Sequence, residues 1–156
     1  MIAIRDGRPD DGEGLKRVHQ SSIFALARDH YSQAELDSWA VGLRPESYRT
    51  AMEGGEAFLV AESKGGELIA FCSTKGHEVM ALYVHPDWVR LGIASDLLAR
   101  AEARIAAEGH RRVQVRGSLS GQIFYESKGY QVVAREAWTT RGGLDLESLR
   151  LEKPLG

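Results

Sequence analysis

A predicted strand that passes through a short loop directly into an amphipathic helix most constrains the fold of this chain. Residues 77–85 are mainly apolar and end at Pro86, whose nitrogen cannot donate a hydrogen bond to a sheet. The helix predicted at residues 92–108 carries apolar side chains at helical spacing: Ile93, Leu97, Leu98, Ala101 and Ile105. A further strand is predicted at residues 111–116. Such a strand–helix–strand crossover implies one pair of parallel strands.

The other predicted strands are joined mainly by short turns that contain glycine. Residues 57–62 and 67–74 flank Ser63-Lys64-Gly65-Gly66, which is typical of a β-hairpin loop. Lys75-Gly76 then leads into the strand at residues 77–85. The remaining strands are predicted at residues 1–5, 130–134 and 146–151. Together these connections predict an α+β fold with a mixed, mostly antiparallel sheet of about six to seven strands.

Helices are predicted to cover both faces of this sheet. Pro9-Asp10-Asp11 caps a helix that is expected to end near Arg28. Ser32-Gln33-Ala34-Glu35 is a capping box, in which the serine and the glutamate each satisfy a backbone N–H of the other. A second helix therefore begins at Ser32. Shorter helices are predicted at residues 45–52 and 121–128.

Length and composition favour one domain, residues 1–156, and exclude several classes of protein. The 20 Lys and Arg residues and 22 Asp and Glu residues give a net charge of −2, unlike the basic surface of a nucleic-acid binder. The apolar runs reach only four or five residues, whereas a membrane span needs about 20. No signal peptide is expected at the N-terminus. The single cysteine, Cys72, cannot form an internal disulfide, and no zinc-ligand spacing occurs. We therefore expect a cytoplasmic protein without metal, nucleic-acid or membrane partners.

The loop between the predicted strand and the long helix is the strongest candidate for a ligand site. It runs Leu82-Tyr83-Val84-His85-Pro86-Asp87-Trp88-Val89-Arg90-Leu91-Gly92-Ile93-Ala94-Ser95. The first N–H groups of a helix lack intrahelical partners and carry partial positive charge. The small residues Gly92 and Ala94 allow an anion such as a pyrophosphate to approach that backbone. No Lys-Ser/Thr pair and no Gly-x-Gly-x-x-Gly pattern is present, which excludes a P-loop and a dinucleotide fingerprint.

This loop resembles the acyl-CoA signature of the GNAT superfamily of N-acetyltransferases, in which Gln/Arg-x-x-Gly-x-Gly/Ala follows a Val-x-Pro strand end. Val84-His85-Pro86 matches the strand end, and Gly92 and Ala94 match the two small positions. Val89 stands where the family has Gln or Arg, so one side-chain contact is lost. The resemblance implies that the backbone amides of residues 90–95 wrap the pyrophosphate of CoA.

A second segment, residues 118–130, is similar to the family's Asn-x-x-Ala-x-x-Phe-Tyr-x-x-x-Gly-Phe pattern. Phe124, Tyr125 and Gly129 match it. Ser120, Gly121 and Tyr130 stand where the family has Asn, Ala and Phe. The two motifs lie in the right order and at the right distance. The resemblance therefore covers about residues 56 to 135 and implies an N-acetyltransferase that uses acetyl-CoA as co-substrate.

In the family's direct-transfer mechanism, a primary amine attacks the thioester carbonyl of acetyl-CoA. An alkylamine with a pKa near 10 is almost wholly protonated at pH 7, so a base must remove its proton. The resemblance assigns the oxyanion to a backbone N–H of the strand that ends at Val84, and the protonation of the thiolate to Tyr125. It implies that acetyl-CoA is bound by Leu82, Tyr83, Val84, Arg90, Leu91, Gly92, Ile93, Ala94, Ser95, Ser120 and Phe124.

Several alternatives stay open for the catalytic base. Glu78 lies on the strand that leads into the site, where several relatives place a glutamate, but it fits a solvent-facing strand residue equally well. His77 and His85 bracket the same strand and have a suitable ordinary pKa. A chain of water molecules is a further alternative. Cys72 is expected to be an inert core thiol, so no acyl-enzyme is expected.

The acceptor amine is not identified by the sequence. A small metabolite, an antibiotic amine, an amino acid and a peptide amine all fit, and an acidic pocket would indicate a polyamine or aminoglycoside. By resemblance, Tyr31, Asp37 and Trp39 border the acceptor pocket, although packing of Trp39 onto the sheet is the simpler interpretation. Arg90, Arg116 and Lys128 are further candidates for contacts with CoA phosphates, Arg90 the strongest of them.

The alternative function is a non-catalytic acyl-CoA-binding sensor or regulatory module. The departures at Val89 and Ser120 favour this alternative, whereas the presence of Tyr125 opposes it. A homodimer is compatible with the resemblance, because members of the family often pair through sheet edges or C-terminal strands. The two exposed edges of such a sheet would otherwise need protection.

Overall fold

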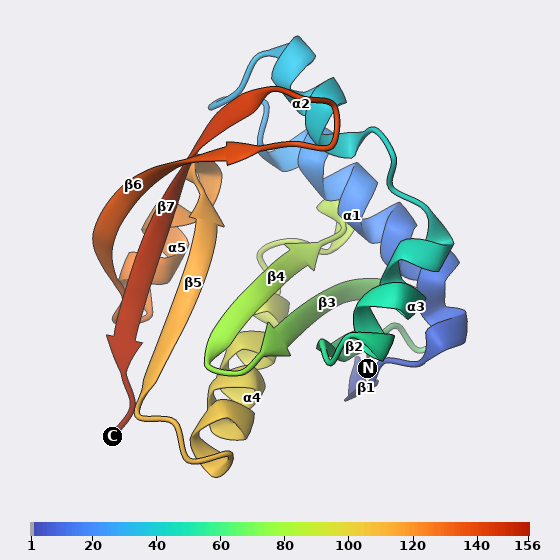
Figure 1. The fold of residues 1–156 in the computed structure, drawn as a ribbon. Helices are drawn as coiled ribbons and strands as arrows, with labels where there is room; N and C mark the ends of the chain where they lie inside the picture. Colours follow the sequence, from blue (N-terminus) through green and yellow to red (C-terminus); the bar gives the residue numbers. More distant parts are fainter. Residues whose placement is uncertain (1) are drawn as a thin grey trace.

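The computed structural model describes residues 2–156, which form one seven-stranded sheet with helices on both faces (Figure 1). The strands are β1 (Ala3–Asp6), β2 (Ala57–Glu62), β3 (Leu68–Lys75), β4 (Glu78–Val84), β5 (Arg112–Ser118), β6 (Gln131–Thr139) and β7 (Asp145–Pro154). The helices are α1 (Gly12–Leu26), α2 (Gln33–Ala40), α3 (Pro45–Glu53), α4 (Ile93–Ala107) and α5 (Gln122–Ser127). The predicted α+β class is confirmed. Met1, where the first predicted strand begins, lies outside the described residues.

The sheet is antiparallel except at its centre. Its strand order is β1-β2-β3-β4-β5-β7-β6, and β4 and β5 are the parallel pair that the crossover through α4 implies. The predicted capping box is also present, because Ser32 Oγ accepts from Glu35 N and Glu35 Oε1 accepts from Ser32 N. The helix expected to end near Arg28 ends at Leu26.

The two C-terminal strands are longer than the sequence predicts. Arg135 and Glu136 interrupt the apolar pattern, so the predicted strand stops at residue 134, whereas β6 continues to Thr139. Across the β6–β7 hairpin, Arg135 pairs with Glu147 at 2.6 Å (Nη1–Oε1), and Glu136 pairs with Arg150. Opposite charges on facing strands stabilise a ladder that a search for apolar alternation does not detect.

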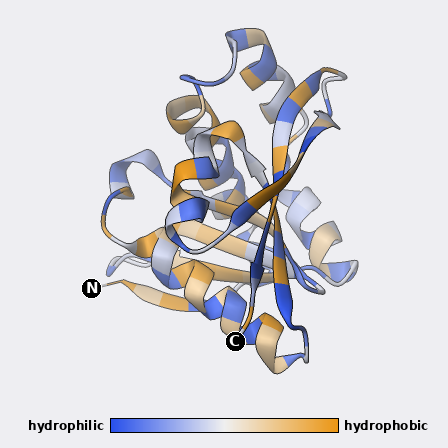
Figure 2. Ribbon diagram, turned by 90° about the vertical axis from the view of Figure 1, so that its left-hand side faces the viewer, coloured by the Kyte–Doolittle hydropathy of each residue, from blue (hydrophilic) through white to orange (hydrophobic). Residues whose placement is uncertain are grey.

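Each face of the central strands packs against its own helix. Leu15 and Val18 of α1 belong to one hydrophobic cluster with Phe71 of β3, while Leu97 and Leu98 of α4 pack on the opposite face. Hydrophobic segments occur along the strands in the middle of the molecule and also on helices (Figure 2). Within the described part of the chain, no helix combines the length and apolar character needed to cross a membrane.

The parallel pair β4 and β5 stays together for only two residues. Glu78 faces Gln114 and Val79 faces Val115, and beyond this point the strands diverge (Figure 1). The divergence begins where the pairing of β4 with β3 shifts register: Thr74 pairs with Val79, whereas Ser73 pairs with Ala81. A backbone segment of β4 is thereby left without a neighbouring strand on one side. Because backbone N–H and C=O groups require hydrogen-bond partners, this edge is available to a ligand.

Candidate active site

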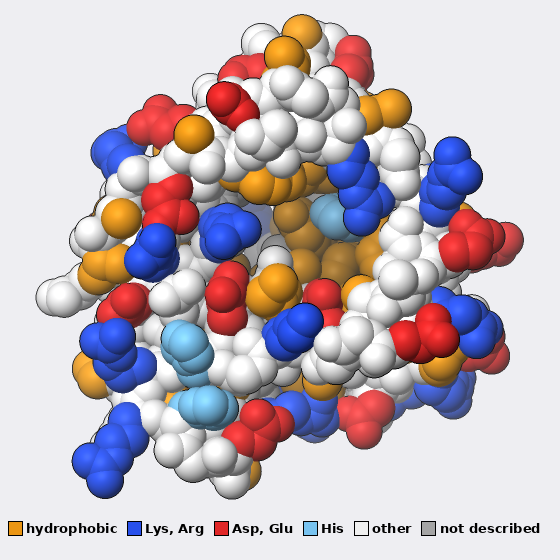
Figure 3. Space-filling model, in the orientation of Figure 1, with side chains coloured by type: hydrophobic (Ala, Val, Ile, Leu, Met, Phe, Trp, Pro, Cys, Tyr) orange, Lys and Arg blue, Asp and Glu red, His pale blue; other side chains and the backbone are white. Residues whose placement is uncertain are grey.

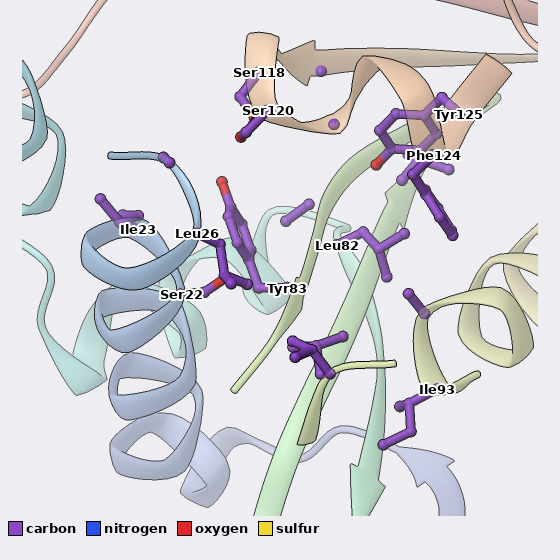
Figure 4. A pocket seen from close by; sticks show the side chains of 18 of the residues that line it. Ser22, Ile23, Leu26, Leu82, Tyr83, Ile93, Ser118, Ser120, Phe124 and Tyr125 are labelled. Carbon is purple, nitrogen blue, oxygen red and sulfur yellow. The ribbon is translucent and has the colours of Figure 1, made fainter. Parts of the chain in front are cut away.

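A pocket of about 440 Å³ occupies the gap between β4 and β5. It is bounded by the C-terminal half of α1, by β4, by the loop that leads into α4, and by β5 and the start of α5. Figure 4 shows Ser22 and Leu26 of α1 on one side of this space and Phe124 and Tyr125 of α5 on the other. Leu82 and Tyr83 of β4 lie between them. The two segments with sequence motifs are thus brought to one cavity.

The free edge of β4 can be assigned to particular residues. His85 N donates to Ile69 O of the β3 segment at 2.8 Å. In an antiparallel ladder, alternate residues direct their backbone groups toward the same neighbour. Ala81 and Tyr83, in register with Ser73 and Phe71, therefore point their N–H and C=O groups toward β3. Leu82 and Val84 point theirs into the gap.

The loop before α4 has an unusual backbone. Arg90 has a φ of 66°, and among residues 2–156 it is the one non-glycine residue with a positive φ. Gly92, at the N-terminus of α4, has a φ of 78°, and a Cβ added there would meet no atom within 4 Å. Left-handed backbone at a non-glycine residue costs about 1–3 kcal/mol and often marks a binding site. Residues of the first turn of α4 line the pocket, and the N–H groups of a first helical turn lack intrahelical partners, as anion binding requires.

Tyr125 lies across the pocket from this loop and is only 7% exposed. Burial raises the pKa of its phenol well above the usual value, so the hydroxyl stays protonated at neutral pH. Figure 4 shows its oxygen directed into the pocket. A Cβ on Gly121 would come within 3.2 Å of Tyr125 Cε2, and one on Gly117 within 3.4 Å. Glycine at position 121, where the motif has alanine, therefore makes room for this ring.

Most of the residues expected to bind acetyl-CoA line the pocket. They are Leu82, Tyr83, Val84, Arg90, Gly92, Ile93, Ala94, Ser95, Ser120 and Phe124. Leu91 is 60% exposed and is not part of the lining. Val89, which replaces the motif's Gln or Arg, lines the pocket with an apolar side chain.

The candidate bases occupy different positions. Glu78 lies outside the lining, at the end where β4 and β5 still pair, and its Oε1 accepts from Gln114 Nε2 at 3.4 Å. His85 Nδ1 accepts from Asp87 N at 3.1 Å and so caps the turn after β4. His77 is exposed, with its ring 5.8 Å from that of His110.

Cys72 is fully buried in the core on the α4 side of the sheet. Burial raises the pKa of its thiol to about 12, so the nucleophilic thiolate is essentially absent at neutral pH. This environment agrees with the expectation of an inert core cysteine.

Tyr31 and Trp39 hold the α1–α2 segment over the pocket. The Tyr31 hydroxyl donates to Glu147 O at 2.6 Å and accepts from Leu119 N at 3.0 Å, so it joins β7 to the turn before α5. Trp39 packs edge-to-face on Tyr31, with ring centroids 5.6 Å apart, and also lines the pocket. Trp39 also packs on Trp138 of β6, with ring centroids 5.3 Å apart, so the expected packing onto the sheet and a place at the pocket are both present. Asp37 is exposed and accepts from Gln33.

Sequence reasoning missed His19, which lies beside the pocket on α1. Its ring stacks on that of Tyr83 with centroids 4.3 Å apart, and its Nδ1 shares a hydrogen bond of 2.9 Å with the Tyr48 hydroxyl. Burial, and then the charge of Arg141, lower the pKa of His19 to about 4. The imidazole is therefore neutral at pH 7. A polar residue four positions after Leu15, on the apolar side of a predicted helix, was the available signal.

Glu56 was also missed, and its position just before β2 gives no signal in the sequence. Its Oε2 accepts from Ser73 Oγ at 2.5 Å. Ser73 is in register with Ala81, which lines the pocket. Glu56 thus brings a second carboxylate to the face of the sheet that α1 covers.

Three comparisons relate the chain to known proteins. A family model described as an acetyltransferase (GNAT) domain matches residues 27–152. An uncharacterized N-acetyltransferase of Escherichia coli K12, YafP, is 23% identical over 141 residues, which are 90% of this chain and 89% of that protein. A GCN5-related N-acetyltransferase structure from Rhodopseudomonas palustris superposes with a TM-score of 0.91 at 28% identity, covering 98% and 95% of the two chains. The PaiA N-acetyltransferase of Thermoplasma acidophilum, solved with coenzyme A, gives a TM-score of 0.79 at 23% identity, with 99% of each chain covered.

Acidification is expected to destabilise the protein through His19. The pKa of this side chain is about 4 in the folded state and about 6.5 in an unfolded chain. Between these values the unfolded state binds the proton and the folded state does not, so the free energy of unfolding falls as the pH falls. Between about pH 7.5 and pH 5 this group accounts for a loss of about 2 kcal/mol.

Urea unfolding at both pH values measures this loss. In His19→Gln, the decrease in the free energy of unfolding between the two pH values should be smaller by about 2 kcal/mol, because glutamine does not titrate. His30→Gln is the matched control, since His30 is exposed. An unchanged pH dependence in His19→Gln would contradict the expectation.

Proposed function

The chain belongs to the GNAT family of acetyltransferases, and from this premise we propose that residues 1–156 form one domain that transfers an acetyl group from acetyl-CoA to a primary amine. The observation that carries the proposal is the gap between β4 and β5. Its pocket is lined both by Tyr125 and by the loop before α4, in which Arg90 and Gly92 have positive φ values. The PaiA N-acetyltransferase, which shares this fold, was solved with coenzyme A.

Acetyl-CoA binding follows from the two free backbone regions. The pyrophosphate is held by the N–H groups of the first turn of α4, with Arg90 at the rim. The extended arm of the cofactor lies against β4 and bonds to the backbone of Leu82 and Val84, as an added strand would. This arrangement directs the thioester toward the narrow end of the gap and brings its sulfur near Tyr125.

Transfer proceeds by direct attack of the neutral amine on the thioester carbonyl. A β4 backbone N–H directed into the gap stabilises the oxyanion of the tetrahedral intermediate. When the carbon–sulfur bond breaks, the Tyr125 hydroxyl gives its proton to the departing thiolate. Burial keeps this phenol protonated until that charge develops beside it.

Removal of the amine proton is assigned to a carboxylate on the acceptor side, directly or through water. Glu78 remains our first candidate, and Glu56 is the second because Ser73 holds it next to Ala81. His85 is a weaker candidate, since its Nδ1 already accepts from the backbone of Asp87.

The proposal also includes the cytoplasm as the site of action and a homodimer as the assembly. In the sheet of residues 2–156, β1 and β6 are the two edge strands. A second copy pairing with either strand would satisfy its free backbone groups.

Tyr125→Phe should lower kcat by at least about tenfold and leave the Kd for acetyl-CoA nearly unchanged, because only the proton donor is removed. Thiol release with a reactive amine gives kcat, and isothermal titration gives Kd. Unchanged turnover would show that Tyr125 is not the acid. Loss of binding would show instead that the ring positions the cofactor.

Gly92→Ala should weaken acetyl-CoA binding at least about tenfold, because its Cβ would occupy the space through which the phosphate reaches the backbone. Gly76→Ala is the matched control: Gly76 also has a positive φ, of 60°, with no atom within 4 Å of an added Cβ. Both variants should lose similar stability, about 1–2 kcal/mol. Equal acetyl-CoA affinities in the two variants would contradict the assigned pyrophosphate site.

A further inference from the structure

We infer that the acceptor is an amine that also carries an acid group, as an amino acid does, and that Arg116 and Arg141 bind this acid group. The inference rests on the proposed function, since it concerns the second substrate of the same pocket. It follows from the charged groups around the hollow on the α1 side of the sheet.

The floor of this hollow is aromatic and nearly apolar. Tyr83, which lines the pocket, contacts both His19 and Phe71, with ring centroids 4.3 Å and 5.6 Å away. Figure 3 shows hydrophobic side chains at the bottom of the hollow and Lys or Arg side chains on two of its sides. Such a floor accommodates an organic side chain but supplies no counterion for a charge.

Arg116 borders the hollow from β5. Val115 and Gly117 are buried in the core on the α4 side, so strand alternation directs Arg116 to the opposite face. Arg116 also lines the pocket. It takes part in none of the ion pairs of residues 2–156, in which the arginines are Arg5, Arg8, Arg17, Arg104, Arg112, Arg135 and Arg150.

Arg141 lies in the turn between β6 and β7, outside the pocket lining itself. Its Nη1 donates to Gly42 O at 3.0 Å and lies 3.5 Å from Ser47 Oγ, which places the guanidinium beside the segment that joins α2 to α3. Burial is the larger influence on both neighbouring groups, lowering the pKa of His19 and raising that of Tyr48, and the positive charge of Arg141 acts on both in the lowering direction. Its field therefore reaches the floor of the hollow. Arg141 likewise has no carboxylate partner among the described residues.

Two carboxylates on this face of the sheet, those of Glu56 and Glu78, are held by neutral groups, whereas Glu136 and Glu152 are paired with Arg150 and Arg112. Glu56 accepts from Ser73, and Glu78 accepts from Gln114. Neither Arg116 nor Arg141 is therefore paired with Glu56 or Glu78. An acceptor with one ammonium and one acid group complements both the carboxylates and the guanidinium groups. A polyamine or an aminoglycoside would instead face two unpaired guanidinium groups.

His19 contributes a neutral hydrogen-bonding group to the floor. Its Nδ1 shares a hydrogen bond with Tyr48, while Nε2 has no hydrogen-bond partner among residues 2–156. Nε2 is also not one of the buried polar atoms that lack a partner in this part of the chain. Nε2 therefore reaches solvent. A neutral imidazole here adds no further positive charge to the acid subsite.

Matched acceptor pairs test the inference directly. Phenylalanine and phenethylamine, methionine and 3-(methylthio)propylamine, and tyrosine and tyramine differ only in the carboxylate. Thiol release should give the acid member of at least one pair a kcat/KM at least about tenfold higher, with spermidine and kanamycin among the poorest acceptors. Preference for the decarboxylated member in every pair, or for a polycation, would overturn the inference.

Substitutions of the two arginines test whether they cause the preference for an acid-bearing acceptor. Arg116→Gln and Arg141→Gln should each raise the KM for the acid-bearing acceptor about tenfold, while the KM for acetyl-CoA and the kcat/KM for its decarboxylated partner stay within about twofold. Arg141→Lys should recover part of the loss. Arg135→Gln, on the same hairpin but paired with Glu147, is the control and should change none of these constants. A raised KM for acetyl-CoA would place the arginine at the cofactor instead.

A binding measurement separates this inference from the proposed function. Titration of the protein–CoA complex with N-acetylphenylalanine, N-acetylmethionine and N-acetyltyrosine, and with their decarboxylated analogues, requires no turnover. If no amine is acetylated but an N-acetylamino acid binds and Arg141→Gln abolishes that binding, the acid subsite stands and the proposed activity fails. If amines are acetylated but none of these N-acetylamino acids binds more tightly than its analogue, the activity stands and the acid subsite fails.

Discussion

The separation of β4 from β5 is the constraint on which the rest of this structure depends. A parallel pair in the middle of a sheet would normally satisfy its backbone groups along its whole length, but here pairing ends after Val79 and Val115. The backbone of Leu82 and Val84 is left facing a cavity. Unpaired peptide groups at the centre of a protein are costly unless water or a ligand bonds to them. The gap is therefore the site that we propose for acetyl-CoA, and it is built from the main chain.

Surrounding residues hold this gap open. Tyr31 links β7 to the turn before α5 through one hydroxyl group, which fixes the far wall of the pocket. Gly117 and Gly121 leave the space that the Tyr125 ring occupies. At the other end, Arg90 and Gly92 have positive φ values and lead the chain into α4, whose first residues line the cavity. Main-chain geometry therefore prepares the proposed cofactor site, while side chains from α1, β5 and the β6–β7 turn form the acceptor side in our proposal.

The sequence predicts the cofactor half of this site better than the acceptor half. The strand–loop–helix unit and Tyr125 lie in contiguous segments, so short-range spacing is enough to bring ten of the eleven expected acetyl-CoA residues to the pocket. Leu91 is the exception, because it points outward. His19, Glu56 and Arg141 come from three distant parts of the chain, and each is positioned by a long-range contact, with Tyr48, Ser73 and Gly42 respectively. Local patterns carry no information about such contacts. The full length of β6 was likewise not predicted, because it depends on charged pairs with β7 that the sequence of β6 alone does not reveal.

Amide hydrogen exchange, measured with and without acetyl-CoA, tests the central claim most directly. If acetyl-CoA bonds to the free edge of β4 and to the first turn of α4, exchange should slow at Leu82 and Val84 and at residues 93–95. Tyr83, whose N–H already points toward β3, should change much less. Acetyl-CoA binding without added protection at Leu82 and Val84, or with equal protection at Tyr83, would contradict a cofactor held by the gap between β4 and β5.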